Sequence, residues 1–235
     1  MTRILDFNGR DADRTVTVAS IRALKGSGSQ FTQVTAGTAE EAAAAEAAGI
    51  DMVVCLAASV PEVRRGSSRL FVTAAMDFGG EITVDDLLAT AFRALSAGAD
   101  AVITARRLDA VRLLAAEGVP VMGHLGFVPK RSNELGGVRI VGRTAAEATA
   151  LWQQFRDLEE AGAFAVECEL IAADVLAEIT PEGQLTELPR DAAYLPNRGE
   201  DAAPAGREQV VLQAIKRGQR LNRIARHADD GRAGG

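Results

Sequence analysis

Short apolar runs alternate along the chain with longer stretches rich in alanine, glutamate, leucine and arginine. The apolar runs are typical of buried strands, and the longer stretches favour helices. The pattern predicts strands at residues 31–36, 52–56, 70–76, 101–104, 119–122 and 164–169. It predicts helices between them at residues 38–48, 84–97, 108–117 and 144–161. This alternation indicates an α/β fold with a parallel sheet.

Residues at the ends of the predicted helices support these boundaries. Thr38 is followed by Glu41 and Thr144 by Glu147, and both pairs have the spacing of a capping box at a helix start. Glycines that stand between a predicted helix and the next strand are expected to end the helix in a left-handed conformation. They are Gly49, Gly98, Gly118 and Gly162.

The spacing of the strands fits either a (β/α)₈ TIM barrel or a doubly wound sheet. The barrel is favoured because no GxGxxG motif follows the first strand, and because polar residues stand at the carboxyl ends of several strands. Six strands are evident, and a complete barrel needs two more from residues 182–204. That stretch is polar, contains proline and is poor in β-branched residues, so we expect the last strands to be atypical or incomplete.

The pattern divides the chain into four parts. They are a barrel core at 1–180, an irregular segment or linker at 181–207, a C-terminal helix at 208–228 and a disordered tail at 229–235. The linker is predicted from its proline, glycine and charged residues, and the helix from apolar residues on a helical period. Two interpretations of this helix stay open: it packs on its own barrel, or it packs on a neighbouring subunit.

Composition narrows the class of protein. The chain has 235 residues, which suits one barrel-sized domain or two small ones. Its net charge of −6 argues against nucleic acid as the main partner. No apolar run reaches the roughly 18–20 residues that span a bilayer, and the N-terminus lacks the apolar core of a signal peptide. We therefore expect a cytoplasmic protein without a membrane partner.

Two cysteines, Cys55 and Cys168, stand inside apolar strand-like runs. This position predicts small buried hydrophobic residues. Neither cysteine belongs to a CxxC or Cys/His spacing typical of zinc, and a disulfide is not expected in the cytoplasm. Neither has a histidine nearby in the sequence, so nothing supports a thiolate nucleophile.

Candidate chemistry concentrates after the fifth strand and on the sixth. His124 follows the fifth predicted strand, where it would lie at a barrel mouth and donate to a bound carboxylate or enolate oxygen. Glu167 and Glu169 are two residues apart on the sixth strand, so both side chains point to one face. Two carboxylates on an apolar strand suit a general base or a metal site. His124 as a hydrogen-bonded structural residue remains an alternative.

Cationic residues follow the fourth strand. Arg106 and Arg107 come directly after it, where a guanidinium facing the mouth can hold a carboxylate or phosphate in a bidentate manner. Exposed arginines at a helix start would give the same pattern. Ion pairs with the glutamates of the sixth strand are a further alternative, formed by Arg106, Arg107, Arg139 or Arg143.

Carboxylates also follow the third strand. Asp77 and Glu81 come after it, and Asp85 and Asp86 are expected in the first turn of the next helix. A divalent metal site would need oxygen ligands from two or more strand ends. One such hypothesis combines Asp77 with the two glutamates of the sixth strand.

The segment GVPVMGHLGFVPKRSNELGGVRIVGRT, residues 118–144, resembles the ketopantoate hydroxymethyltransferase (3-methyl-2-oxobutanoate hydroxymethyltransferase) family. Gly-His-Leu-Gly, a proline, Gly-Gly and Gly-Arg-Thr recur there. Four other segments are similar to family segments in the same order: AAEAAGIDMVV, FVTAAMDFGG, GADAVITARR and AGAFAVECELIAADVLAEIT. The resemblance implies a (β/α)₈ TIM barrel of the phosphoenolpyruvate mutase/isocitrate lyase-like superfamily.

The resemblance also implies a reaction. The family joins a hydroxymethyl group from methylenetetrahydrofolate to a 2-oxo acid through an enolate, in pantothenate biosynthesis. Mg²⁺ held by two aspartates binds the keto acid, and a glutamate takes the proton. The family histidine corresponds to His124 and the family glutamate falls on Glu169, whereas Glu167 is an extra acid.

Other family positions are changed. The Gly-Asp-Ser after the second strand reads Leu56-Ala57-Ala58, and the Ala-Asp of the third strand reads Ala74-Ala75. Both metal aspartates are therefore replaced, and the usual Mg²⁺ geometry is not expected because a hard divalent ion needs anionic oxygen ligands. The Lys-Leu-Glu-Gly-Gly after the fourth strand reads Ile103-Thr104-Ala105-Arg106-Arg107.

These observations predict a divergent hydroxymethyltransferase-like enzyme, a one-carbon transferase or lyase, that makes or breaks a carbon–carbon bond on a 2-oxo acid. Glu169 would act as base and His124 as oxyanion donor, with Glu167 in contact with the substrate and Arg106 or Arg107 in place of the metal. No metal ligand is assigned, and Mg²⁺ and methylenetetrahydrofolate are expected only if the family reaction is retained. The alternative is an inactive barrel that acts as a binding or assembly partner. The family forms homo-oligomers, so self-association is expected.

Overall fold

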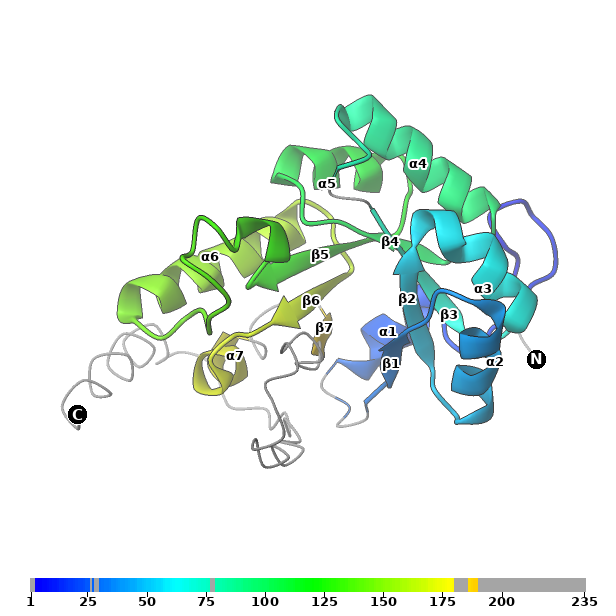
Figure 1. Cartoon of the computed structure of the whole chain (residues 1–235), viewed down its shortest axis with the longest axis horizontal. Coiled ribbons are helices and arrows are strands. Elements are labelled where there is room, and N and C mark those ends of the chain that lie inside the picture. Colours follow the sequence, from blue (N-terminus) through cyan, green and yellow to red (C-terminus); the bar gives the residue numbers. More distant parts are fainter. Residues whose placement is uncertain (1–2, 26, 28–29, 77–78, 180–185, 190–235) are drawn as a thin grey trace.

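The computed structural model describes residues 3–25, 27, 30–76, 79–179 and 186–189. Its centre is a parallel sheet of seven strands in the order β1-β2-β3-β4-β5-β6-β7, curled so that helices cover its outer face (Figure 1). The strands are β1 (Gln33–Thr35), β2 (Met52–Leu56), β3 (Phe71–Ala75), β4 (Ala101–Ile103), β5 (Val121–Gly126), β6 (Ala165–Glu169) and β7 (Thr186–Pro189). The helices are α1 (Val18–Leu24), α2 (Ala39–Ala47), α3 (Val60–Gly66), α4 (Val84–Ser96), α5 (Leu108–Ala116), α6 (Ala145–Glu160) and α7 (Ala173–Ile179), with the 3₁₀ turns η1 (Ala57–Ser59) and η2 (Pro129–Arg131).

The six predicted strands are confirmed as β1 to β6, and the four predicted helices as α2, α4, α5 and α6. β5 continues through Gly126, so His124 lies inside the strand rather than after it. β7 falls in a stretch for which the sequence predicted no strand. Its residues pair in parallel with β6, from Ala165 opposite Thr186 to Cys168 opposite Pro189. An available sheet edge forms this strand despite its weak β propensity.

The barrel is open in the described part of the chain. Among the described residues, no pairing joins β7 to β1, and α1 packs against β7 instead. The sequence predicted that the last strands would be atypical or incomplete. Within the residues that the structure describes, one strand, β7, follows β6. The predicted C-terminal helix at 208–228 lies outside the described residues. No helix in the described ranges is long and apolar enough to cross a membrane.

The predicted helix ends are mostly confirmed. Thr38 and Glu41 form a capping box, with Glu41 N donating to Thr38 Oγ1 at 3.2 Å and Thr38 N to Glu41 Oε2 at 3.1 Å. The predicted box at Thr144 is only half formed, because the Glu147 carboxylate accepts from the backbone of Gly142 and Arg143 instead. The four glycines all have positive φ, as a left-handed C-cap requires. They are Gly49, Gly98, Gly118 and Gly162.

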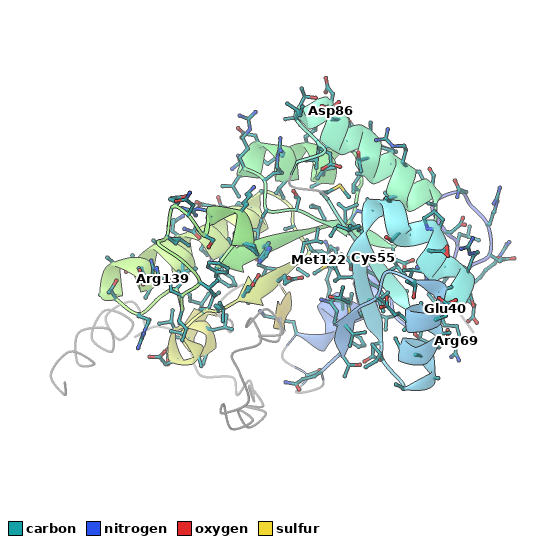
Figure 2. The ribbon with its side chains drawn as sticks, viewed as in Figure 1. Glu40, Cys55, Arg69, Asp86, Met122 and Arg139 are labelled. Carbon is teal, nitrogen blue, oxygen red and sulfur yellow. The ribbon has the colours of Figure 1, made fainter. Side chains whose placement is uncertain are left out.

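Two apolar clusters lie on opposite faces of the sheet. The larger cluster fills the space between the sheet and its covering helices and includes Val121, Val166 and both cysteines. The smaller one lies on the inner face, and Met122 from this cluster sits near the centre of the molecule in Figure 2. Its members are Val16, Ile21, Met52, Phe71, Ala101, Ile103, Met122, Phe164 and Ala165. Helix α1 supplies Ile21 to this cluster, so α1 covers the amino ends of the strands.

A charged cluster joins the segments that precede β3 and β4. Asp100 Oδ1 accepts from Arg14 Nε at 2.8 Å, and Asp100 Oδ2 accepts from Val72 N at 2.8 Å and pairs with Arg64. Arg64 Nε also donates to Gly98 O at 2.7 Å. Burial lowers the pKa of Arg64 to about 10, and the neighbouring Asp100 carboxylate opposes that change. Arg64 therefore stays charged at neutral pH, and the Asp100 carboxylate compensates its buried positive charge.

Substituting Asp100→Asn should destabilise the fold. The change leaves Arg14 and Arg64 charged and largely buried without a carboxylate, which costs roughly 3 kcal/mol in comparable cases. Urea unfolding followed by circular dichroism measures the effect. The control is Asp109→Asn, because Asp109 pairs with Arg112 on the surface and such pairs contribute about 1 kcal/mol or less. Equal losses for the two variants would contradict a special role for Asp100.

Candidate functional site

Three polar side chains share the inner face of β5 and β6. The two strands pair in parallel with His124 opposite Glu167. Because side chains alternate along a strand, His124 lies on the same face as Met122, and Glu167 and Glu169 lie on the same face as Ala165. Met122 and Ala165 both belong to the inner apolar cluster. The predicted placement of the two glutamates on one face is therefore confirmed, and the structure brings His124 to that face as well.

The three groups are close together and buried. The exposed fractions of His124, Glu167 and Glu169 are 8%, 2% and 4%. His124 Nε2 lies 3.0 Å from Glu169 Oε2, within hydrogen-bonding distance. One ligand atom from each of the three residues can be chosen so that all lie within 4.8 Å of one another. An ionised carboxylate in such a dry position is costly unless it is hydrogen-bonded or paired, and the contact with His124 supplies such a bond for Glu169.

The chain around Glu169 holds its backbone in place at the end of β6. Gly126, at the end of β5, has a φ of +88°, and a Cβ atom added there would lie 2.2 Å from Glu169 O. The next residue, Phe127, donates its backbone N–H to Glu169 O at 2.7 Å. Leu170 follows with a φ of 48°, a left-handed conformation that is unusual for a residue other than glycine. Glycine at position 126 thus allows β5 to approach the end of β6.

The glycine-rich segment after β5 also packs against β6. Val141 N donates to Leu170 O at 2.8 Å, and Ala172 N donates to Val141 O at 2.9 Å. These two bonds form an isolated parallel bridge between Val141 and Ile171. Arg139, from the same segment, pairs with Glu147 of α6 at 2.8 Å. The segment therefore supports the end of β6, and the arginine that the sequence offered to the inner glutamates is used elsewhere.

Arg106 and Arg107 line a different hollow. A pocket of about 490 Å³ lies between the starts of α4 and α5, and Lys130 from η2 also lines it. Arg106 is held there by backbone carbonyls, donating from Nη1 to Glu81 O at 2.7 Å and from Nη2 to Ile82 O at 3.1 Å. The structure therefore places these arginines beside the loop after β3 rather than against the two inner glutamates.

Lys130 adds a third cation to this pocket. Its Nζ donates to Ala105 O at 2.9 Å. Burial lowers the pKa of Lys130, and the positive charges of Arg106 and Arg131 lower it further. No sequence pattern points to Lys130, because its nearness to Arg106 depends on how the loops after β4 and β5 fold together.

The acidic residues after β3 have separate positions. Glu81 is buried, with 6% exposure, and its Oε2 has no hydrogen-bond partner in the described part of the chain. Asp85 and Asp86 lie in the first turn of α4 as predicted, and hydrogen bonds from Thr83 lower the pKa of Asp86. Asp77 lies outside the described residues. The hypothesis that joined it to the two glutamates stays a prediction, whereas the structure itself places His124 beside them.

Both cysteines lie on the outer face of the sheet, away from the inner cluster. Cys55 and Cys168 are buried among the apolar side chains under the helices, as the sequence predicted. Burial raises the pKa of the Cys55 thiol to about 11, against a smaller opposing effect of Arg64. This thiol is therefore protonated at neutral pH.

The residues that correspond to the family's metal aspartates cannot bind a cation. Ala57 lies in η1, directly after β2, and Ala75 ends β3. Neither methyl side chain has a donor atom, and the preceding Leu56 is an apolar residue with 60% exposure. A Mg²⁺ ion needs oxygen ligands, so these positions do not fit the ion that the resemblance implies.

Comparison with known proteins identifies the family. The family profile described as ketopantoate hydroxymethyltransferase matches residues 54–187. The 3-methyl-2-oxobutanoate hydroxymethyltransferase of Thermobifida fusca is 32% identical over 230 residues, covering 87% of this chain and 79% of that protein. The chain belongs to the ketopantoate hydroxymethyltransferase family. The enzyme of the same name from Pyrococcus abyssi is 41% identical over 124 residues, which cover 51% of this chain and 44% of that protein. The match thus spans less than half of the Pyrococcus relative.

Solved structures confirm the fold class. A phosphonopyruvate hydrolase solved with oxalate and Mg²⁺ matches with a TM-score of 0.56 and 15% identity, over 77% of this chain and 75% of that one. A 2,3-dimethylmalate lyase, described as a phosphoenolpyruvate mutase/isocitrate lyase superfamily member, matches with a TM-score of 0.50 and 14% identity, over 77% and 83%. The curled β/α sheet of this family member is therefore a partial TIM barrel, with the fold of these two structures.

Replacing Gly126→Ala should destabilise the protein by about 2 kcal/mol or more, because the new Cβ would meet Glu169 O and φ is positive. Gly49→Ala is the matched control, since Gly49 also has a positive φ, +75°, but open space around the added atom. That control should cost about 1 kcal/mol. Urea unfolding of both variants measures the difference. Equal costs would show that contact with β6 does not constrain position 126.

Cys55 should resist thiol reagents in the native protein. With a pKa of about 11, roughly one thiol in a thousand is ionised at pH 8. In a Cys168→Ser background, labelling by Ellman's reagent should be very slow at pH 8 and should rise as the pH approaches 11. Unfolding in guanidinium should make Cys55 react at once. Fast labelling of the folded protein at pH 8 would contradict the buried, protonated thiol.

Proposed function

We propose that the protein makes or breaks a carbon–carbon bond on a 2-oxo acid through an enolate, with Glu169 as the base. The observation that carries this proposal is the buried His124–Glu169 pair, 3.0 Å apart, at the carboxyl ends of β5 and β6. Catalytic groups of TIM barrels come from the carboxyl ends of strands. Membership of the ketopantoate hydroxymethyltransferase family supplies the reaction class.

Glu169 suits proton removal because its carboxylate is shielded from water and held by its neighbours. A base acts best when it is positioned before the substrate arrives. His124 Nε2 holds the carboxylate in the structure. When a 2-oxo acid enters, we propose that Nε2 turns to the carbonyl oxygen and donates to the charge that develops there. Glu167, on the same face, would then contact the substrate beside the reacting carbon.

The negative charge of the enolate must be compensated. Because Ala57 and Ala75 stand where the family has its metal aspartates, another group has to do so. Arg106 and Arg107 follow β4, which neighbours β5 in the sheet. Both arginines line the separate pocket beside the loop after β3, so we propose that Arg106 or Arg107 turns to the substrate carboxylate when the 2-oxo acid binds and takes over part of the charge compensation. The pocket shared with Lys130 makes this part of the molecule cationic. Neither Mg²⁺ nor methylenetetrahydrofolate takes part in the proposed proton removal, and transfer of a one-carbon unit would be a later step.

A second candidate function is assembly with a partner, without catalysis. Leu56, the last residue of β2, is 60% exposed, and Ile82, which lines the arginine pocket, is 81% exposed. Exposed large apolar side chains are typical of protein-interaction sites when they gather into a patch. The alanines at positions 57 and 75 fit a barrel that no longer uses the family's metal. Self-association and a cytoplasmic location stay predictions.

Enolate formation can be tested by the exchange of the C3 proton of 3-methyl-2-oxobutanoate in D₂O, followed by NMR. The wild-type protein should promote exchange in the presence of EDTA, because the proposed base needs no metal. Glu169→Gln should lower the rate at least about 100-fold, since general bases contribute roughly 10²–10⁴-fold. Glu134→Gln is the control, because Glu134 is a surface residue paired with Arg131.

Two outcomes would contradict the proposal. Unchanged exchange in Glu169→Gln would remove Glu169 as the base. If the folded wild-type protein promoted no exchange and bound no 2-oxo acid, the enzyme proposal would fail and the assembly function would gain support.

A further inference from the structure

We propose that His124, Glu167 and Glu169 form a binding site for one divalent transition-metal ion of the Zn²⁺ type. The three side chains come from two neighbouring strands, and their potential ligand atoms lie within 4.8 Å of one another. All three residues are more than nine-tenths buried. This site is separate from the β2 and β3 positions that correspond to the family's aspartates, where Ala57 and Ala75 stand.

The spacing of the three groups suits a single ion. Ligand atoms that surround a Zn²⁺ ion at about 2.0–2.2 Å lie roughly 3–4 Å apart. His124 Nε2 and Glu169 Oε2 are already 3.0 Å apart. The 4.8 Å limit for the full set leaves only a small side-chain rotation to bring Glu167 into the same shell. An ion would then replace the hydrogen bond between His124 and Glu169.

The donor set selects the kind of ion. One imidazole nitrogen and two carboxylates are ligands typical of zinc and of other first-row transition metals. Mg²⁺ prefers an octahedron of oxygen atoms and keeps several waters, which a buried set containing an imidazole does not favour. Three protein ligands leave one position of a tetrahedral ion open, as in catalytic zinc sites. The site should therefore bind Zn²⁺ or Co²⁺ in preference to Mg²⁺.

The backbone keeps the ligands in place before an ion arrives. His124 and Glu167 lie opposite each other in the parallel register of β5 and β6. The Phe127 N–H bond to Glu169 O fixes the end of β6 relative to β5. Ligands mounted on paired strands lose little freedom on binding, and a rigid, preorganised site of this kind gains affinity.

Metal binding and base catalysis would exclude each other at this site. Glu169 would use its carboxylate as a ligand, so it would not be free to take a proton. One equivalent of Zn²⁺ should therefore abolish the exchange of 3-methyl-2-oxobutanoate. This consequence rests on the proposed function, whereas the binding of the ion does not. A failure of the exchange assay alone would leave the metal site to be decided by direct binding.

The binding experiment uses the full chain and Zn²⁺ alone, with calorimetry and metal analysis after dialysis. Wild-type protein should bind one Zn²⁺ per chain, and an excess of Mg²⁺ should not displace it. His124→Asn and Glu167→Gln should each weaken binding at least tenfold. The chain has two histidines, so His227→Asn is the matched control for His124, and Glu134→Gln is the control for Glu167. Thermal unfolding shows whether each variant is folded.

A second measurement requires no change in the site. In His227→Asn protein, His124 is the remaining histidine, so its imidazole NMR signals can be followed directly. Zn²⁺ should shift these signals in a one-to-one titration, and Co²⁺ should shift them by its paramagnetism. The site is overturned if wild-type protein binds no stoichiometric Zn²⁺, if the His124 signals do not move, or if folded His124→Asn and Glu167→Gln bind as tightly as wild type. An active protein whose exchange is unaffected by one bound Zn²⁺ also overturns it.

Discussion

The parallel register between β5 and β6 is the constraint on which the site depends. This register sets His124 opposite Glu167 and brings the imidazole within 3.0 Å of the Glu169 carboxylate. Side chains alternate strictly along a strand, so a shift of one residue would turn outward either His124, if β5 moved, or both glutamates, if β6 moved. The apolar clusters on the two faces oppose such a shift, because it would exchange Met122 and Val121 between differently shaped cores.

Burying three ionisable groups in this region costs free energy, and the arrangement is sensitive to small structural changes. Charged groups in a dry interior require hydrogen bonds or partners, and a small change in backbone position alters both. Gly126 allows the close contact with β6, and the bridge between Val141 and Ile171 holds the glycine-rich segment against the same strand. The segment that marks the family in sequence thus acts as a structural support for Glu169.

Family membership and site chemistry give different information about this protein. The family profile and the relatives establish the family, and the structure places His124 and Glu169 on the neighbouring strands β5 and β6. The second strand instead ends in Leu56 and is followed by Ala57, and the third ends in Ala75; none of these side chains has a metal-binding atom. Charged chemistry is consequently concentrated on β5, β6 and the loop after β4.

Short-range patterns in the sequence were enough to predict the local structure. The positions of β1 to β6, the helix start at Thr38, the glycine helix ends and the shared face of Glu167 and Glu169 all follow from short-range periodicity and capping. Only the tertiary structure decided the presence of β7, the pairing of Arg139 with Glu147, the carbonyl partners of Arg106 and the contact between His124 and Glu169. These features join residues that are distant in the chain. They therefore depend on strand register and on loop packing. Local propensity carries no information about either.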